Sequence, residues 1–360
     1  MQRSKDGSDR KRALLTAILA TPDAAAAGLF TLFDVLSSVG RDWEMLHGRP
    51  PRPPRFLPRL VSEDGRGFDG PNGVRIEPHA SFAEVPAPDL VLVPDLILDP
   101  NAPLPPAYSA TATWVRGAHA AGAIVASICS GALVLARAGL LEGAEATTHW
   151  AYCDALARQF PGVRVRRERI LVPAGEGHRV VTAGGASSWN DLLLYLVARL
   201  AGPEEALRIA KLYLLQWHGE GQLPYAALTA GRQHEDRAIA ECQRWIADNY
   251  ARDNPVAAMA AMAGLSERSF HRRFKRATGL APLAYVQALR IEEAKHLLET
   301  TEAGVDEVGT EVGYAEPASF RRLFRRAVGV SPAVYRRRFR PLFRLTGGTA
   351  GPGAAATPRT

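Results

Sequence analysis

The chain has 360 residues, of which 47% are hydrophobic and 22% are charged, and its formal net charge is +7. This length and composition favour a folded protein of two or three domains. No apolar run reaches the ~18 to 20 residues that cross a bilayer, and Pro22 and Asp23 interrupt the apolar stretch near the start, so we expect neither a membrane span nor a secretory signal. Three cysteines without metal-ligand spacing, Cys129, Cys153 and Cys242, predict a cytoplasmic protein with no disulfide scaffold, metal or cofactor.

Strand-like and helix-like segments alternate in the predicted first domain, residues 11–201. We expect strands at 13–20, 89–95, 123–128 and 179–184, and helices at 27–39, 107–122, 131–141 and 187–202. This alternation predicts an α/β domain of flavodoxin-like, three-layer type, with a parallel sheet between two layers of helices. Residues 55–78 instead predict a pair of hairpin strands around a Gly/Asn turn, after a Pro-rich surface loop.

Helical patterns dominate the rest of the chain. Residues 202–235 are predicted to form a helical connector, and residues 236–340 an all-α domain. Residues 341–360 are predicted to form a disordered tail, because their Gly- and Ala-rich end lacks apolar periodicity. Within 236–251 the apolar side chains recur on one helical face, which predicts a core stripe: Ile239, Cys242, Trp245, Ile246 and Tyr250.

An internal repeat lies in the helical part. Residues 266–285 match residues 316–335 at a constant offset of 50 (320 − 270, 324 − 274), and the paired residues are Phe270 and Phe320, Phe274 and Phe324, Gly279 and Gly329, Pro282 and Pro332, Tyr285 and Tyr335. Each copy follows a short helix that ends at a glycine-containing turn. A helix, a turn and an Arg-rich second helix predict a tandem helix-turn-helix domain.

The second helix of each copy has a phenylalanine face and a cationic face. We predict that the outward, DNA-binding residues are Arg268, His271, Arg272 and Lys275 in the first copy, and Ala318, Arg321, Arg322 and Arg325 in the second. Arginine can donate two hydrogen bonds to guanine in the major groove, while its neighbours hold phosphates. Two alternatives stay open: a merely solvated basic face, and a nonspecific chromatin-like binder with steep salt dependence.

The helix predicted at 282–301 separates the two copies by roughly 25 to 30 Å. This length approaches the ~34 Å of one DNA turn, so both second helices can enter successive major grooves. Residues 236–339 resemble an AraC/XylS-type DNA-binding domain, through "FHRRFKRATGLAPLAYVQALRIEEAKHLL" and "VGYAEPASFRRLFRRAVGVSPAVYRRRF". The resemblance implies base contacts from Arg268, His271, Arg272, Arg321 and Arg322, with apolar contact from Ala318.

The segment "SICSGALVLARAGLL", residues 127–141, predicts a strand that ends on Cys129 and turns directly into a helix. Such an elbow exposes a nucleophile, the helix start favours its thiolate, and Gly131 allows close backbone approach. Cys129 is therefore a candidate nucleophile, a redox-sensitive thiol or a pocket-wall residue. Ligands bind at the carboxyl ends of parallel strands, so we predict a ligand pocket of Cys129, Ser130, His149 and Asp23. Cys153 and Cys242 are expected to be small buried apolar residues, and "TAGGASS" at 182–188 is a weak candidate anion site.

The first domain resembles a ThiJ/PfpI-type domain, similar to class I glutamine amidotransferases, through the Cys129 elbow, "PDLVLVPD", "EGAEATTHW" and "RVVTAGGASSWNDLLLYLVARLAG". A ThiJ/PfpI-type domain followed by an AraC-type domain is the arrangement of GlxA-like transcriptional regulators. The segment "HGEGQLPYAAL" of this chain also resembles the interdomain segment of those regulators. The resemblance implies a homodimeric regulator that senses a small-molecule effector and binds a double-stranded DNA operator.

Two departures from enzymatic relatives predict that Cys129 is a vestigial nucleophile. Such enzymes often place a histidine after the cysteine, where this chain has Ser130, and an acid in the first loop, where only Asp23 stands. We therefore expect a non-catalytic domain. The alternative is a cysteine-dependent amidase or deglycase-like enzyme fused to a DNA-binding module.

Overall fold

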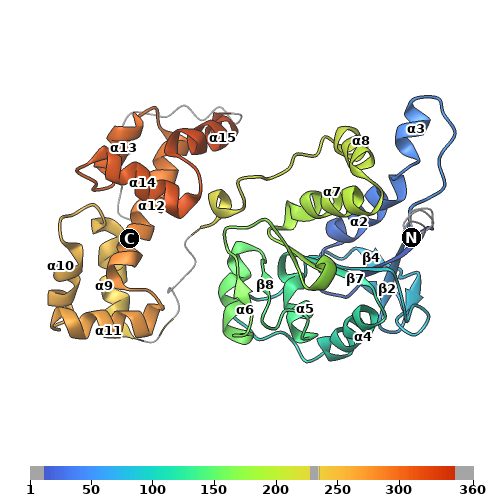
Figure 1. Ribbon diagram of the computed structural model, residues 1–360. Helices are drawn as coiled ribbons and strands as arrows, with labels where there is room; N and C mark the ends of the chain where they lie inside the picture. Colours follow the sequence, from blue (N-terminus) through green and yellow to red (C-terminus); the bar gives the residue numbers. More distant parts are fainter. Residues whose placement is uncertain (1–11, 228–233, 235, 345–360) are drawn as a thin grey trace, which may run out of the picture. The chain divides into compact units, whose positions relative to one another are not determined.

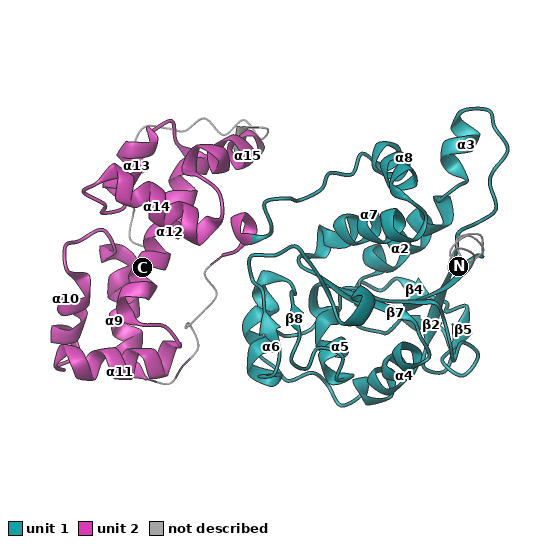
Figure 2. Ribbon diagram, in the orientation of Figure 1, with its two compact units in different colours: residues 1–222 teal, residues 223–360 magenta. Residues whose placement is uncertain are grey.

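The computed structural model describes residues 12–227, 234 and 236–344 (Figure 1). The chain divides into two compact units, residues 1–222 and residues 223–360, which Figure 2 colours separately. The division falls within the predicted connector, whose helix α8 (Pro203–Tyr213) packs on the first unit.

A seven-stranded sheet forms the centre of the first unit. Its order is β10-β11-β7-β6-β1-β2-β5, and only the β10–β11 pair is antiparallel. The four predicted strands are confirmed, and Ile18 lies in register between Leu60 and Leu92. The strands are β1 (Leu14–Leu19), β2 (Phe56–Ser62), β5 (Ala80–Ser81), β6 (Leu90–Val93), β7 (Ile124–Ile128), β10 (Leu171–Ala174) and β11 (Val180–Ala183).

Helices cover both faces of this sheet, so the predicted three-layer α/β fold is confirmed (Figure 1). One face carries α2 (Ala26–Ser38), α7 (Trp189–Leu200) and α8. The other carries α4 (Tyr108–Ala120), α5 (Ala132–Arg137) and α6 (Cys153–Gln159). The strands β1, β6 and β7 are buried almost throughout, because a parallel sheet covered on both sides exposes neither face to water.

The hairpin predicted over residues 55–78 is only partly correct. Its first half is β2, which pairs in parallel with β1 in the main sheet. Only β3 (Phe68–Asp69) and β4 (Arg75–Ile76) form an antiparallel pair. The reason is the apolar side chains of β2: Phe56, Leu60 and Val61 are buried in the main core, so this strand belongs in the sheet.

Several short elements connect these layers. They are α3 (Asp42–Leu46), the parallel pair β8 (Glu145–Ala146) and β9 (Arg164–Val165), and the single-turn 3-10 helices Cys129–Gly131, Trp150–Tyr152, Glu176–His178, Ala186–Ser188 and Leu223–Tyr225. The last of these belongs to the second unit.

The second unit is helical among its described residues, as predicted. Its helices are α9 (Arg237–Asn249), α10 (Pro255–Met262), α11 (Glu267–Thr278), α12 (Pro282–Thr300), α13 (Val305–Glu311), α14 (Pro317–Val328) and α15 (Pro332–Arg344). Helix α15 continues past the predicted domain end at residue 340, and the remaining part of the predicted tail, 345–360, lies outside the described residues.

Two hydrophobic clusters make up the core of this unit, one for each copy of the repeat. The first joins Ile239, Cys242 and Ile246 of α9 to Phe270 and Phe274 of α11. The second surrounds Phe320 and Phe324 of α14. Helix α12 serves both, since its first half contributes Tyr285 and Val286 to one cluster and its second half contributes Ile291, Ala294 and Leu298 to the other.

Candidate nucleic-acid interface and ligand pocket

The two Arg-rich helices, α11 and α14, repeat each other in detail. Phe270, Phe274, Phe320 and Phe324 are completely buried. Ring centroids lie 5.4 Å apart in the first phenylalanine pair and 5.7 Å apart in the second. Both helices end at a glycine of the repeat in left-handed conformation. The phenylalanines thus fix each helix against its neighbours and leave the opposite face in solvent.

All eight predicted DNA-binding residues lie on these solvent faces. Arg268, His271, Arg272 and Lys275 on α11 are exposed, and so are Ala318, Arg321, Arg322 and Arg325 on α14. The four side chains on α11 make no hydrogen bond or ion pair to another described residue. They are therefore available to an external anion, and their contacts to bases stay a prediction.

Two of the arginines on α14 have partners in their own unit. Arg321 forms an exposed ion pair with Asp306 of α13, and Arg322 donates to the Ser319 hydroxyl over 3.0 Å. Glu316 is the N-cap residue of α14, and its carboxylate accepts from the Ser319 hydroxyl over 3.1 Å. Exposed ion pairs of this kind contribute about 0 to 1 kcal/mol, so DNA phosphates can displace them.

Arg290 joins the two copies of the repeat, and sequence reasoning did not single it out. Its guanidinium donates to the carbonyls of Tyr250, Gly313 and Arg252 over 2.7, 2.7 and 3.0 Å. It also lies 5.3 Å from the centroid of the Tyr314 ring. Because α12 spans roughly 28 Å and Arg290 ties its middle to both halves, the two recognition helices have a fixed separation within this unit.

Cys129 occupies the predicted elbow between β7 and α5. Its φ of 54° is left-handed, which is a strained conformation for a residue with a side chain. A Cβ on Gly131 would lie 2.6 Å from the Pro94 carbonyl oxygen, so only glycine allows this approach to β6. The geometry predicted from the sequence is therefore present at both residues.

The protonation of Cys129 differs from the expectation. Burial, together with the nearby carboxylate of Asp95, raises the pKa of its thiol to about 12, against a smaller opposing effect of hydrogen bonds with Ser130. The helix start was expected to favour the thiolate. Burial outweighs it because only 6% of the residue is exposed, and desolvation disfavours the charged form.

Ser130 and His149, two other predicted pocket residues, hydrogen-bond to backbone groups of the same domain. Ser130 is fully buried, and its hydroxyl donates to the Leu96 carbonyl over 2.6 Å and accepts from the Leu96 N–H over 2.8 Å. His149 is half-buried, burial lowers its pKa, and its Nδ1 accepts from the Ala151 N–H over 3.1 Å. Cys153 and Cys242 are buried free thiols, as expected.

Asp23 lines a cavity of about 540 Å³ beside the carboxyl ends of β1 and β2. Its carboxylate accepts from the Tyr108 hydroxyl over 2.8 Å. Further lining comes from Thr21, Ser62, Glu63, Arg66, Phe82 and Thr111. Cys129, Ser130 and His149 do not line this cavity. Asp23 and Ser130 nevertheless bond to adjacent residues of one segment, since the Ile97 N–H donates to the Asp23 carbonyl over 2.8 Å and the Leu96 N–H donates to the Ser130 hydroxyl over 2.8 Å.

Asp95 is a candidate site residue that sequence reasoning missed. It lies two residues after the end of β6, beside the switch point between β1 and β6. A Cβ on Gly28 would lie 2.2 Å from its Oδ1, and burial raises the pKa of its carboxyl group. Its place at the end of a buried strand was readable from "PDLVLVPD", but its proximity to Cys129 depends on the order of the strands.

Comparison with known proteins follows the division seen in the structure. Residues 19–199 match the family model described as DJ-1/PfpI family, and residues 259–338 match a helix-turn-helix domain model. The chain belongs to the DJ-1/PfpI family. The predicted pairing of such a domain with an AraC-type helix-turn-helix domain is confirmed.

Relatives of this DJ-1/PfpI protein include regulators and an enzyme. It is 30% identical over 216 residues to the HTH-type transcriptional regulator GlxA of Rhizobium meliloti, covering 59% of this chain and 64% of that protein. It is 28% identical over 271 residues to the HTH-type transcriptional regulator CdhR of Pseudomonas aeruginosa, covering 73% and 76%. It is 29% identical over 196 residues to the isonitrile hydratase of Pseudomonas putida, covering 54% and 75%.

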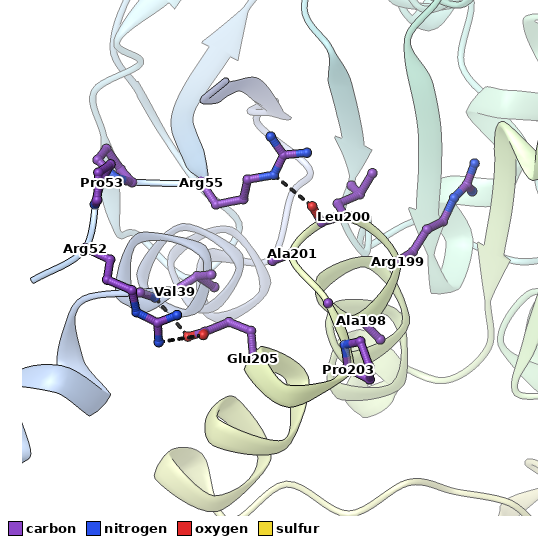
Figure 3. Close-up of a pocket in the computed structure, with 13 residues that line it drawn as sticks. Val39, Arg52, Pro53, Arg55, Ala198, Arg199, Leu200, Ala201, Pro203 and Glu205 are labelled. Atoms are coloured by element: carbon purple, nitrogen blue, oxygen red, sulfur yellow. Dashed lines mark hydrogen bonds and ion pairs between the residues drawn. The ribbon is translucent and has the colours of Figure 1, made fainter. Parts of the chain in front are cut away.

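A second hollow in the DJ-1/PfpI domain, about 530 Å³ in volume, lies at the opposite ends of the strands (Figure 3). Its arginines are engaged internally: Arg52 pairs with Glu205 over 2.9 Å, and Arg55 donates to the Leu200 carbonyl over 2.8 Å. Glu205 is buried and also accepts from the Gly40 N–H over 3.0 Å. The bonds to Glu205 fasten α8 to the domain, so we assign the residues of this hollow a structural role.

Among the described residues, no helix is long and apolar enough to cross a membrane.

Proposed function

We propose that this chain is a transcriptional regulator that binds a DNA operator through α11 and α14 and senses a small molecule in its DJ-1/PfpI domain. The observation that carries the proposal is the pair of exposed cationic faces, presented by two copies of one helix-turn-helix unit. Sequence-specific readers place such a helix in the major groove, where arginine reaches guanine. The names of the GlxA and CdhR relatives agree with it.

The repeat favours DNA over a merely solvated basic surface. A solvated face needs no fixed spacing, whereas here a shared helix and the Arg290 carbonyl bonds hold two cationic helices at a set separation. Two recognition helices on one rigid unit match successive major grooves. A homodimer in the cytoplasm would double this number and recognise a longer operator.

The cavity that contains Asp23 is the place we assign to the effector. Its volume of about 540 Å³ suits a small metabolite. It combines the carboxylate of Asp23, the Tyr108 hydroxyl and the aromatic ring of Phe82, at the sheet edge where parallel sheets bind ligands.

The decisive experiment is binding of the full chain to a duplex from the region upstream of its own coding sequence, against a scrambled duplex, at two salt concentrations. A regulator prefers its operator by at least about a hundredfold. We expect Arg272→Ala and Arg322→Ala each to cost about 1 to 3 kcal/mol of operator binding and to relax the preference. Affinity that falls with salt but shows no preference would identify a nonspecific binder instead.

Arg244→Ala is the matched control. Arg244 lies on α9 of the same unit, and its side chain is 77% exposed. The substitution therefore removes one positive charge, as Arg272→Ala does, but at a position outside α11 and α14. We expect its operator affinity to change by about twofold or less. A loss as large as that of Arg272→Ala would mean that overall charge, and not the α11 face, drives binding.

A cysteine-dependent enzyme is the second candidate, favoured by the strained elbow at Cys129 and by the isonitrile hydratase relative. The raised thiol pKa and the engaged Nδ1 of His149 argue against it, because covalent catalysis needs an activated thiolate. Cys129→Ser separates the two functions: an enzyme loses turnover by orders of magnitude, whereas a sensor keeps its operator affinity.

A further inference from the structure

The segment that leads out of the DJ-1/PfpI domain is bound firmly to that domain. Asp191 of α7 is fully buried, and its carboxylate accepts from the N–H and the Nδ1 of His218 over 2.8 and 2.7 Å. Asn190 donates to the Gln216 carbonyl over 2.8 Å. Residues 216–218 therefore lie on the start of α7 and cannot be a free tether.

Gln222 ends this segment and is itself buried, with 2% of its surface exposed. Its Nε2 donates to the Thr148 carbonyl over 2.8 Å, the Thr147 hydroxyl over 3.1 Å and the Arg169 carbonyl over 3.2 Å. A Cβ on Gly184 would lie 3.0 Å from the Gln222 carboxamide, so β11 also closes around it. Its Oε1 is buried and has no hydrogen-bond partner among the described residues.

Thr148 connects Gln222 to the Cys129 elbow. The Thr148 hydroxyl donates to the Cys129 carbonyl over 2.6 Å, while the Thr148 carbonyl accepts from Gln222. Thr148 is completely buried, and buried polar groups keep their partners because losing one costs about 1 to 3 kcal/mol. A displacement at the elbow is therefore transmitted to the Gln222 carboxamide through a single residue.

The residues that follow Gln222 belong to the other unit and are bound there. Pro224 is buried, the Tyr225 ring meets Phe339 edge-on at 5.4 Å, and Lys295 donates to the Ala226 carbonyl. One residue, Leu223, thus separates a side chain buried in the DJ-1/PfpI domain from one buried in the DNA-binding unit.

We propose that the Gln222 carboxamide couples the ligand edge of the DJ-1/PfpI domain to operator binding. A molecule in the Asp23 cavity displaces the Cys129 elbow through residues 96–97, to which both Asp23 and Ser130 bond. This displacement moves Thr148, breaks the hydrogen bonds of Gln222 and releases residues 216–222. The release changes the affinity of α11 and α14 for the operator. The unpartnered Oε1 lowers the free-energy cost of moving the Gln222 carboxamide out of its buried site, because this oxygen gains hydrogen bonds in water. The coupling rests on the proposed function for its readout on DNA.

The test compares Gln222→Met with Gln216→Met in the full chain. Methionine has nearly the shape of glutamine but no N–H donor. Gln216 is exposed in the same segment, so Gln216→Met makes the same chemical change and leaves the hydrogen bonds of Gln222 intact. Measured by hydrogen exchange, residues 214–222 should exchange about tenfold faster in Gln222→Met than in Gln216→Met, with β1, β6 and β7 unchanged.

Operator binding is the second readout. By linkage, the burial of the Gln222 carboxamide and operator binding must affect each other equally. Gln222→Met should therefore shift the operator Kd by about fivefold or more. Saturating operator should change hydrogen exchange at residues 214–222 in the wild type only. Faster exchange together with wild-type affinity would reduce Gln222 to a structural anchor and overturn the proposal. Unchanged exchange would also overturn it.

A third comparison does not depend on DNA. Thr148→Val removes the hydroxyl that reaches the Cys129 carbonyl, and Thr148→Ser keeps it. Faster exchange at 214–222 in the valine variant alone supports the relay, by which we mean the link from the Cys129 elbow through Thr148 to Gln222. If the protein also prefers no duplex, the proposed function fails and the relay stands. Equal exchange in the two variants refutes the relay even if the protein binds its operator.

Discussion

At the scale of single residues, Cys129 has the backbone of a nucleophile and the protonation of a buried thiol. Its φ of 54° places it on a sharp elbow, yet burial raises its pKa to about 12. A thiol with that pKa is almost entirely protonated at neutral pH, and the thiolate is the reactive form. The residue therefore suits the wall of a sensing site better than a reaction centre.

The rate at which iodoacetamide alkylates Cys129 in the folded protein tests this assignment. Because the pKa is raised to about 12, we expect the rate to rise about tenfold per pH unit from about pH 7 to about pH 10 without reaching a plateau. Peptide mass spectrometry distinguishes Cys129 from Cys153, whose pKa burial raises to about 11. A plateau near neutral pH would indicate an activated thiolate and restore the enzymatic candidate.

At the scale of elements, the helix-turn-helix units depend on close contact between their two helices. Gly309 of α13 is buried against the Phe320 ring of α14, and a Cβ there would lie 2.8 Å from a ring carbon. Phe320 is completely buried and cannot move aside without disturbing the second cluster. The position of α14, and with it the direction of its arginines, is therefore sensitive to a single methyl group.

Gly309→Ala should destabilise the second unit by about 1 to 3 kcal/mol through overpacking, as measured by urea unfolding, and weaken operator binding. Gly117→Ala is the matched control, because Gly117 is an exposed helical glycine of α4 with open space around its missing Cβ. This control should be neutral or stabilising by about 0.5 to 1 kcal/mol. Equal destabilisation by both changes would contradict the packing argument.

At the scale of the whole molecule, the two units have separate cores and are joined by a short, anchored segment. The first core surrounds the seven-stranded sheet, and the other two clusters lie entirely in the second unit. Because the described residues give each unit a core of its own, each unit should unfold on its own. The proposed coupling uses the covalent connection at Gln222 and Leu223, where the chain passes from the first unit to the second.

Calorimetry of two matched core variants tests this independence. Phe324→Ala should destabilise the transition of the second unit by about 3 to 5 kcal/mol and leave the first unchanged. Leu196 of α7 is completely buried, so Leu196→Ala should destabilise only the transition of the first unit, by about 2 to 5 kcal/mol. If either variant moves both transitions equally, the units unfold as one.

The sequence by itself determined the elements and their periodicities. Alternating strands and helices predict the three-layer domain, the 50-residue repeat predicts α11 and α14, and the aromatic spacing separates their inward and outward faces. These features are local, because side-chain direction follows from position along a helix or strand. The Cys129 elbow and the need for Gly131 were readable for the same reason.

The tertiary structure decided what depends on which strands are neighbours. It placed β2 beside β1, brought Asp95 to Cys129, placed Asp23 in the wall of a cavity and buried Ser130. It also seated Gln222 against Thr148, 74 residues away along the chain. Long-range pairing and burial set these contacts and the pKa values that follow from them, and neither can be read from residue spacing.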